Sequence, residues 1–276
     1  VEVAFDDAPP RRPSAERFVI NTAVRPFIPP LDGLDEIDYL TSTSILELDT
    51  VPDHLIVLGG GYIGLEFGQM FRRFGSDVTL IERGDQIVSR EDADVAETLT
   101  EILQDDGIRV LTSTRMDCTE KRADGTLSVC LEGPDAPQRL RGTHLLVAAG
   151  RRPNTDVLNL DAAGVETTER GYVAVNDRLE TSADPIAAIG DVKGGPAFTH
   201  ISYDDYRIVR DNWLEDAGRS IEGRLVPYTL FTDPQLGRVG LSEEQAIEQG
   251  RDVLVAKMPM THVARALEVD ETRGLM

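Results

Sequence analysis

Residues 55–82 read LIVLGGGYIGLEFGQMFRRFGSDVTLIE, and this stretch decides the fold. The apolar run at 55–58 is typical of a buried strand, and Gly59–Gly64 form a G-x-G-x-x-G turn directly after it. The pattern then predicts a helix over 62–74 and a second buried strand over 78–81. This order of strand, glycine turn, helix and strand is typical of a nucleotide-binding α/β unit.

Three glycines of the turn have distinct structural roles. Gly59 permits the tight turn, Gly61 lets a pyrophosphate approach the backbone, and Gly64 lets the helix pack closely on the strand. The helix start offers free amides and a positive dipole end to phosphates. Glu82 ends the second strand, 18 residues after Gly64, where a carboxylate meets the adenine ribose hydroxyls. Together these features predict dinucleotide binding; the alternative is a glycine-rich turn in some other α/β domain.

Two acidic side chains bear on the ligand. Glu82 accepts hydrogen bonds from both ribose hydroxyls but repels a 2′-phosphate, so NAD(H) is favoured over NADP(H). Arg83 acts in the opposite sense, because its side chain could pair with that phosphate. Glu66 lies in the first turns of the helix, where the residues alone indicate only a carboxylate near the positive helix end.

Regular α/β alternation continues after this unit. A helix over 92–106 and a strand over 108–111 precede segments at 115–141 that predict an antiparallel meander, and 145–149 returns as an apolar strand. The remaining expected elements are a strand at 17–20, a helix at 203–215, a strand at 228–231, a helix opened by a Ser242–Gln245 capping box, and a strand starting near Asp252.

The charge balance excludes some classes of partner. The chain has 49 Asp and Glu against 28 Lys and Arg, a formal net charge of −21, which argues against nucleic acid and anionic membranes as partners. No apolar run has the length of a membrane span. The four histidines are scattered, so no metal site is expected. Cys118 and Cys130 are too few for a disulfide framework and are expected to be reduced in a cytoplasm.

Three ordered motifs resemble those of a known family. Gly59–Phe67, Ala149–Asn154 and Ala188–Asp191 match the flavin-dependent pyridine nucleotide-disulfide oxidoreductases, the family of dihydrolipoamide dehydrogenase and mercuric reductase. Asn21-Thr22-Ala23 resembles that family's A-T-G turn, with alanine in place of the glycine. The stretch Thr199–Arg207 is similar to the subgroup linked to reactive-chlorine resistance.

The resemblance implies residues for two cofactors, NAD(H) and FAD. The nicotinamide nucleotide residues would be Gly59, Gly60, Gly61, Tyr62, Ile63, Gly64, Glu66, Glu82, Met116 and Gly150. The flavin residues would be Thr22, Ala23, Asp191, Ala197, Phe198, Thr199 and His200. Ile63 and Glu66 would lie where the nicotinamide meets the flavin, which makes Glu66 the candidate catalytic residue. Asp191 would bind the ribityl or pyrophosphate region of FAD.

The resemblance also implies the architecture. The fold class is α/β, a Rossmann-like FAD/NAD(P)-binding two-domain fold with a β-meander insertion, followed by the start of an α+β dimerisation domain. The expected segments are 1–50 (end of the first FAD segment), 51–150 (NAD(H) domain), 151–223 (second FAD segment) and 224–276 (truncated dimerisation domain). The family's first G-x-G-x-x-G, its C-x4-C redox pair and its C-terminal His-Glu pair do not occur here. We therefore expect the chain to be a central segment of a longer protein.

The implied activity is that of a cytoplasmic, homodimeric, FAD-dependent NAD(P)H:disulfide oxidoreductase. Hydride would pass from NADH to FAD and on to a small-molecule, disulfide or other thiol-linked acceptor. Two alternatives stay open: a flavoprotein similar to soluble pyridine nucleotide transhydrogenase, and a non-catalytic NAD(H)-binding module. A C-x4-C pair upstream of this sequence would separate the first alternative from the disulfide reductase.

Overall fold

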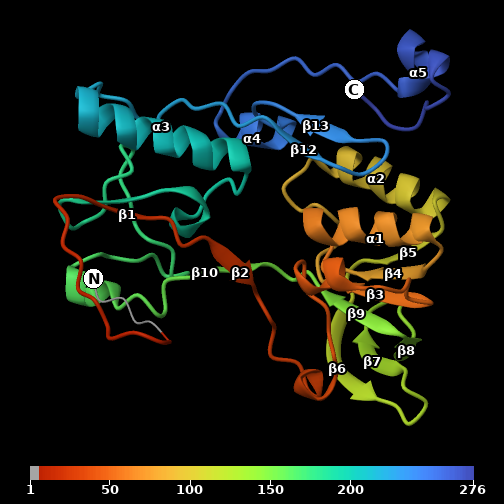
Figure 1. Cartoon of the computed structure of the whole chain (residues 1–276). Coiled ribbons are helices and arrows are strands. Elements are labelled where there is room, and N and C mark those ends of the chain that lie inside the picture. The colour runs from red at the N-terminus through yellow and green to blue at the C-terminus, as the bar shows by residue number, and fades with distance from the viewer. Residues whose placement is uncertain (1–5) are drawn as a thin grey trace. The chain divides into compact units, whose positions relative to one another are not determined.

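A computed structural model describes residues 6–276 and divides the chain into two compact units (Figure 1). Unit 1 comprises the residues up to Arg25 together with Arg151–Val226, and unit 2 comprises Pro26–Gly150 together with Pro227–Met276. The start of the expected first segment, residues 1–5, lies outside the described residues. Residues 26–50, expected to end the first FAD segment, thus group with the nucleotide-binding region.

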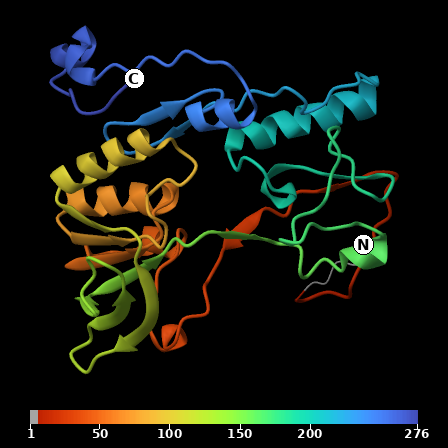
Figure 2. The same cartoon turned by 180° about the vertical axis from the view of Figure 1, so that it is seen from behind.

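Unit 2 is built on a four-stranded parallel sheet in the order β5-β4-β3-β9. The strands are β3 (His54–Leu58), β4 (Asp77–Ile81), β5 (Ile108–Leu111) and β9 (His144–Val147). Helices α1 (Tyr62–Phe74) and α2 (Ala93–Asp105) cover one face of this sheet, as both views show (Figures 1 and 2). The predicted order of strand, glycine turn, helix and strand is confirmed, and the helix at 62–74 and the strand at 108–111 have their predicted bounds.

Residues 26–50 belong to unit 2 because their apolar side chains enter its core. Leu34, in the 3₁₀ helix η1 (Leu34–Glu36), packs on the sheet face opposite α1. Ile45, in η2 (Ser44–Glu47), packs with the core beneath the helices, and Leu40 forms a bridge to Leu146 of β9. The stretch 26–150 begins and ends at one hydrogen bond, from the Phe27 N–H to the Gly150 carbonyl (2.9 Å).

The predicted meander forms an antiparallel sheet of β6 (Arg115–Lys121), β7 (Leu127–Glu132) and β8 (Arg139–Gly142). Cys118 lies directly opposite Cys130 in the pairing of β6 with β7, and the two form a disulfide. The expectation of two reduced cysteines is therefore wrong for this structure. Both cysteines are six residues from Asp124 in the hairpin turn, so antiparallel pairing brings them face to face.

The C-terminal part of unit 2 is less regular. It contains β12 (Tyr228–Leu230), β13 (Leu236–Arg238), α4 (Glu243–Glu248), η5 (Met260–His262) and α5 (Ala264–Glu268). The capping box is confirmed: the Ser242 hydroxyl accepts from the Gln245 N–H, and the Gln245 side chain accepts from the Ser242 N–H. The strand predicted near Asp252 is wrong. Residues 253–255 are exposed and pair with no strand in the described part of the chain, so their apolar character alone does not make a strand.

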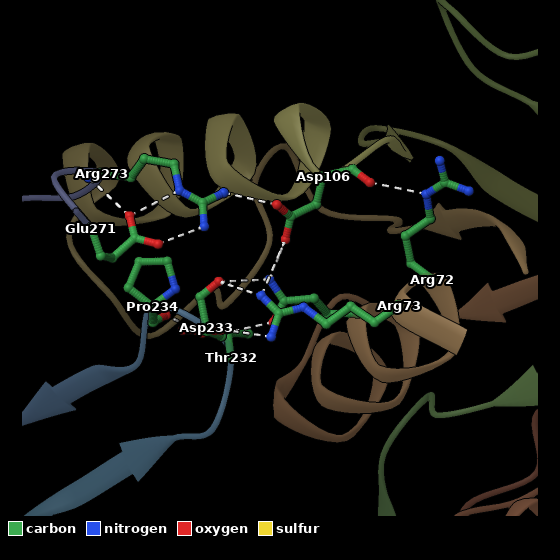
Figure 3. A network of polar contacts seen from close by, with 9 residues as sticks. Arg72, Arg73, Asp106, Thr232, Asp233, Pro234, Glu271 and Arg273 are labelled. Atoms are coloured by element: carbon green, nitrogen blue, oxygen red, sulfur yellow. Dashed lines mark hydrogen bonds and ion pairs between the residues drawn. The ribbon is translucent and has the colours of Figure 1, made fainter. Parts of the chain in front are cut away.

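A polar network fixes this C-terminal part to the ends of α1 and α2 (Figure 3). Asp106, which ends α2, pairs with Arg273 (2.8 Å), and Arg273 in turn pairs with Glu271 (2.8 Å). Arg73 of α1 reaches Asp233 (2.6 Å) on the loop between β12 and β13. The pairs Asp106–Arg273 and Arg73–Asp233 join segments that lie more than 150 residues apart in the sequence.

The described residues of unit 1 form two short strand pairs and one long helix. Strand β1 (Phe18–Ile20) runs parallel to β11 (Ile186–Ala188), and β2 (Val24–Pro26) pairs with β10 (Arg151–Pro153). The remaining elements are η3 (Leu160–Ala163), η4 (Gly190–Lys193) and α3 (Thr199–Glu215). Helix α3 begins four residues before the predicted start, because Ile201 is buried on the same face as Asp205 and Ile208. Among residues 6–276, no helix is long and apolar enough to cross a bilayer.

Candidate functional site

The glycine turn between β3 and α1 has the geometry that its sequence predicts. Gly59 has a φ of +116°, in the region that favours glycine. A Cβ on Gly64 would lie 2.1 Å from the carbonyl oxygen of Gly59, so any larger residue there would push the helix off the strand. A Cβ on Gly59 would lie 2.4 Å from the carbonyl oxygen of Ala148, which places the end of β9 beside the turn. Both glycines are required by close backbone packing.

Two other glycines are open. Gly61, at the start of α1, and Gly150, after β9, are exposed, and a Cβ on either would meet nothing within 4 Å. Their strands are neighbours: Leu58 of β3 pairs with Val147 of β9, so both glycines follow the carboxyl edge of the sheet. Ligands of open α/β sheets bind at this edge. The exposed backbone beside a helix N-terminus therefore fits a pyrophosphate.

Glu82, directly after β4, accepts a backbone hydrogen bond from the glycine turn. Its Oε2 accepts from the Gly60 N–H (2.7 Å) and its Oε1 accepts from the Gly84 N–H (2.7 Å). Both carboxylate oxygens are thus fixed by backbone amides. The half-buried carboxylate lies at the edge where the adenine ribose would be bound, whereas its neighbour Arg83 is exposed.

Tyr62, the residue after Gly61, is held by a buried carboxylate. Its hydroxyl donates to Glu91 Oε1 (2.9 Å), the Tyr228 hydroxyl donates to the same oxygen, and Arg238 pairs with Oε2 (2.9 Å). Glu91 is only 3% exposed. Burial, with these hydrogen bonds, raises the pKa of Tyr62, so the hydroxyl stays a donor. Nothing in the local sequence around Glu91 indicates this role, because its partners come from α1, β12 and β13.

The other predicted nucleotide residues lie in two places. Ile63 and Glu66 are half-buried in the first turns of α1, and Glu66 Oε1 accepts from the Phe231 N–H (2.9 Å). The Glu66 carboxylate thus contacts the C-terminal part of unit 2 as well as lying near the helix start. Met116 lies apart from the turn: it is 4% exposed and packs in the core with Ile81 and Leu111. The assignments of Glu66 and Met116 to a cofactor stay predictions.

The predicted flavin residues of unit 1 gather at the ends of two parallel strands. The turn 21–23 follows β1, and Gly190-Asp191 follow β11, whose Ala188 pairs with Ile20. Gly190 has a φ of +69°, and a Cβ there would lie 2.9 Å from the Asn21 side-chain oxygen. Ala23 has a φ of +59°, a left-handed backbone conformation that glycine adopts more readily than alanine.

Asn154, from the Ala149–Asn154 motif, joins the two halves of unit 1. Its Nδ2 donates to the Thr22 carbonyl (2.8 Å), and the Thr22 hydroxyl donates to the Asn154 carbonyl (3.0 Å). Arg25 donates to Asn154 Oδ1 (2.9 Å) and pairs with Asp156. The residues that hold the turn 21–23 are thus about 130 residues away from it in the sequence.

The polar and aromatic groups around this turn fit a flavin nucleotide. The Asp191 carboxylate is half-buried and has no hydrogen-bond or ion-pair partner among the described residues, so it can accept hydroxyl donors. Ala197, Thr199 and His200 are exposed at the start of α3, and the His200 ring stacks on Phe198 with centroids 5.6 Å apart. A free carboxylate beside exposed backbone and an aromatic pair is suited to a ligand that carries both hydroxyls and a ring.

Two family models match the sequence. The pyridine nucleotide-disulphide oxidoreductase model covers residues 7–205, and the dimerisation-domain model of the same group covers residues 226–276.

Curated relatives and a solved structure agree with these matches. The chain is 40% identical over 262 residues to a mercuric reductase of Staphylococcus aureus, covering 95% of this chain and 48% of the relative. It is 41% identical over 263 residues to the probable pyridine nucleotide-disulfide oxidoreductase RclA of Escherichia coli strain K12, covering 95% and 58%. The solved Cu(II) complex of the HOCl-induced flavoprotein disulfide reductase RclA from Escherichia coli superimposes with a TM-score of 0.90 at 39% identity, covering 99% of this chain and 61% of that one. The chain therefore spans 48 to 61% of the length of these relatives.

Proposed function

Because the chain belongs to the pyridine nucleotide-disulphide oxidoreductase family, we propose that it supplies the nicotinamide nucleotide site and part of the flavin site of an FAD-dependent NAD(P)H oxidoreductase of the disulfide-reductase type. When bound, FAD accepts hydride from NADH and passes electrons on to a disulfide or related acceptor. The residues of this chain bind and orient the two nucleotides.

One observation carries the proposal: the open backbone at Gly61, placed between the helix start and the fixed Glu82 carboxylate. Gly61 and Gly150 leave room for the pyrophosphate, and the amides at the start of α1 carry the positive end of the helix dipole. Glu82 favours the two free ribose hydroxyls of NAD(H) over the phosphate of NADP(H).

On the flavin side, we assign the hydroxyl-rich part of FAD to Asp191 and to the turn at Thr22 and Ala23. Ala197, Phe198, Thr199 and His200 are assigned to the surroundings of the isoalloxazine. Ile63 and Glu66 are assigned to the contact between nicotinamide and flavin. The two cysteines of this sequence pair with each other in the β6–β7 hairpin, so the proposal gives them no part in transfer to the acceptor. The dimerisation-domain match supports a homodimer, which we place in the cytoplasm.

The test uses the protein expressed from its complete gene. We expect it to purify with FAD, and we expect NADH to bleach the visible flavin absorbance faster than NADPH at equal concentration. A protein that binds NADH but takes up no FAD would contradict the proposal and support the non-catalytic module. Flavin reduction followed by transfer only to a second nicotinamide nucleotide, and to no disulfide, would support the transhydrogenase-like alternative.

A further inference from the structure

A buried cluster of charged side chains contacts the backbone of the proposed flavin turn at Gly190. Asp205 of α3 is 0% exposed, and it contacts Lys193 (Nζ to Oδ2, 3.3 Å) and Arg224 (Nη1 to Oδ1, 2.8 Å), whose side chains are 6% and 14% exposed. Its Oδ2 also accepts from the Gly190 N–H (2.9 Å). The cluster therefore joins α3, η4 and the segment after α3 at one carboxylate.

Stability alone is a weak explanation for this arrangement. Removing a carboxylate and two cations from water costs more free energy than burying apolar side chains of similar size, so buried ion clusters often contribute little net stability. Asp205 differs from an ordinary ion pair because one of its acceptor positions is used for the backbone of a turn. A carboxylate that binds an amide fixes the peptide more strongly than a neutral acceptor does.

The fixed amide belongs to the peptide between Ile189 and Gly190, one residue before Asp191. Gly190 has a left-handed φ of +69°, its amide points at Asp205, and a Cβ added there would lie 3.1 Å from the Ser202 hydroxyl oxygen of the same helix. Asp191 itself has no partner for its carboxylate among the described residues. The direction of that carboxylate thus depends on the Gly190 peptide, and through it on Asp205.

We propose that Asp205 is a positioning residue for flavin binding: it holds the Gly190 amide and so presents the Asp191 carboxylate to the hydroxyls of FAD. Lys193 and Arg224 hold the Asp205 carboxylate in place through their ion pairs. The inference rests on the proposed function, because it requires that Asp191 binds FAD.

The experiment measures FAD affinity by fluorescence titration of apoprotein made from the complete gene, with NADH affinity and thermal unfolding as parallel readouts. Asp205→Ala is expected to weaken FAD binding about ten- to hundred-fold, as for the loss of a charge-assisted hydrogen bond. NADH affinity is expected to stay unchanged, because the glycine turn lies in unit 2. The matched control is Asp211→Asn, which alters a carboxylate on the same helix that pairs with Arg219 and touches no part of the turn.

A second set of variants keeps the test decisive if Asp205→Ala does not fold. Asp205→Asn retains an oxygen that can accept from Gly190 but leaves Lys193 without its counter-charge, and the double variant with Lys193→Met removes that stranded ammonium. We expect the double variant to bind FAD within about five-fold of the parent, which is less than 1.4 kcal/mol, and Asp205→Asn alone to bind more weakly than the double variant.

The outcomes separate the two proposals. A folded Asp205→Ala variant, or Asp205→Asn alone, that binds FAD as tightly as the parent would show that the cluster serves only stability and would overturn the inference. An Asp211→Asn variant that loses FAD binding to the same extent as Asp205→Ala would overturn it as well. A parent protein that takes up no FAD would overturn the proposed function as well.

Discussion

The chain forms two turns at the carboxyl ends of parallel strands, and they are built in opposite ways. The turn Gly59–Gly64 is encoded by one continuous stretch, and its close contacts are between backbone atoms of neighbouring segments. The turn formed by residues 21–23 and Gly190-Asp191 is assembled from distant segments and held by the side chains of Asn154 and Asp205. The first turn is therefore sensitive to added volume in the backbone, and the second to the loss of single polar side chains.

The largest effect should come from adding a methyl group to the first turn. Gly64→Ala places a Cβ 2.1 Å from a backbone carbonyl oxygen, so we expect a loss of about 3 kcal/mol or more in unfolding free energy and loss of NADH binding. Gly61→Ala is the matched control, because its Cβ meets nothing within 4 Å. It should cost less than about 1 kcal/mol in stability yet still weaken NADH binding. Urea unfolding and NADH titration measure both; a Gly61→Ala variant with unchanged NADH affinity would contradict the assignment of Gly61 to the ligand.

The next effect concerns Glu82, whose carboxylate accepts from the Gly60 amide of the first turn. Glu82→Ala leaves the Gly60 and Gly84 amides without their acceptor, which should cost about 1.5–3 kcal/mol in unfolding free energy. The preference for NADH over NADPH should fall as well. Arg83→Ala serves as the control for removing a neighbouring exposed charge. A Glu82 variant that keeps its full preference for NADH would refute the ribose assignment.

Asn154→Ala tests the second turn, and its expected effect on stability is smaller than that of Glu82→Ala. It removes the hydrogen bond to the Thr22 carbonyl and the acceptor for Arg25, so we expect a loss of about 1 kcal/mol in unfolding free energy and weaker FAD binding. NADH affinity should not change. Asn176→Ala is the control, since its contacts are to Arg178 and Glu180 nearby in the sequence. Equal effects on both nucleotides would mean that the two turns are not independent.

The smallest effect is expected at the exposed pair of Arg25 and Asp156. The hydrogen bond from Arg25 lowers the pKa of Asp156 below its ordinary value of 3.8. A carboxyl with a lowered pKa stabilises the fold above that ordinary value, and the contribution disappears as the pH falls through the lowered pKa. Asp156→Asn should therefore lower the thermal midpoint slightly at neutral pH and not at all in strong acid or high salt. A difference that persists in acid would show that the pair is not the cause.

The elements that the sequence predicts well are those set by local patterns. The helix over 62–74 has a glycine at each end and an apolar stripe, and both ends were placed correctly. The sequence predicts the start of α3 four residues too late, because residues 199–202 have weak helix propensity. Burial of Ile201 stabilises the helix over these residues. The strand near Asp252 failed for the converse reason, since three apolar residues need a neighbouring strand and have none in the described part of the chain.

The residues of the candidate site also fall into two groups: those that local patterns predict and those that long-range packing sets. Spacing alone located Gly59, Gly61, Gly64 and Glu82, whose contacts lie within one α/β unit. The partners of Asn154, Glu91 and Asp205 are set by long-range packing, so no local pattern could assign them. For the cysteines a signal was present: equal spacing on both sides of Asp124 in a predicted hairpin indicates that they face each other.

The hydrogen bond between Phe27 and Gly150 has a consequence for evolution and for engineering. It brings together the two ends of a 125-residue stretch, 26–150, that carries the whole parallel sheet and its glycine turn. A segment whose ends meet can be inserted into a host chain, or exchanged for a related one, without stretching the host at the crossing points. Exchanging the stretch 26–150 can therefore change the nucleotide preference of such a protein, while the flavin-side residues before and after it stay the same.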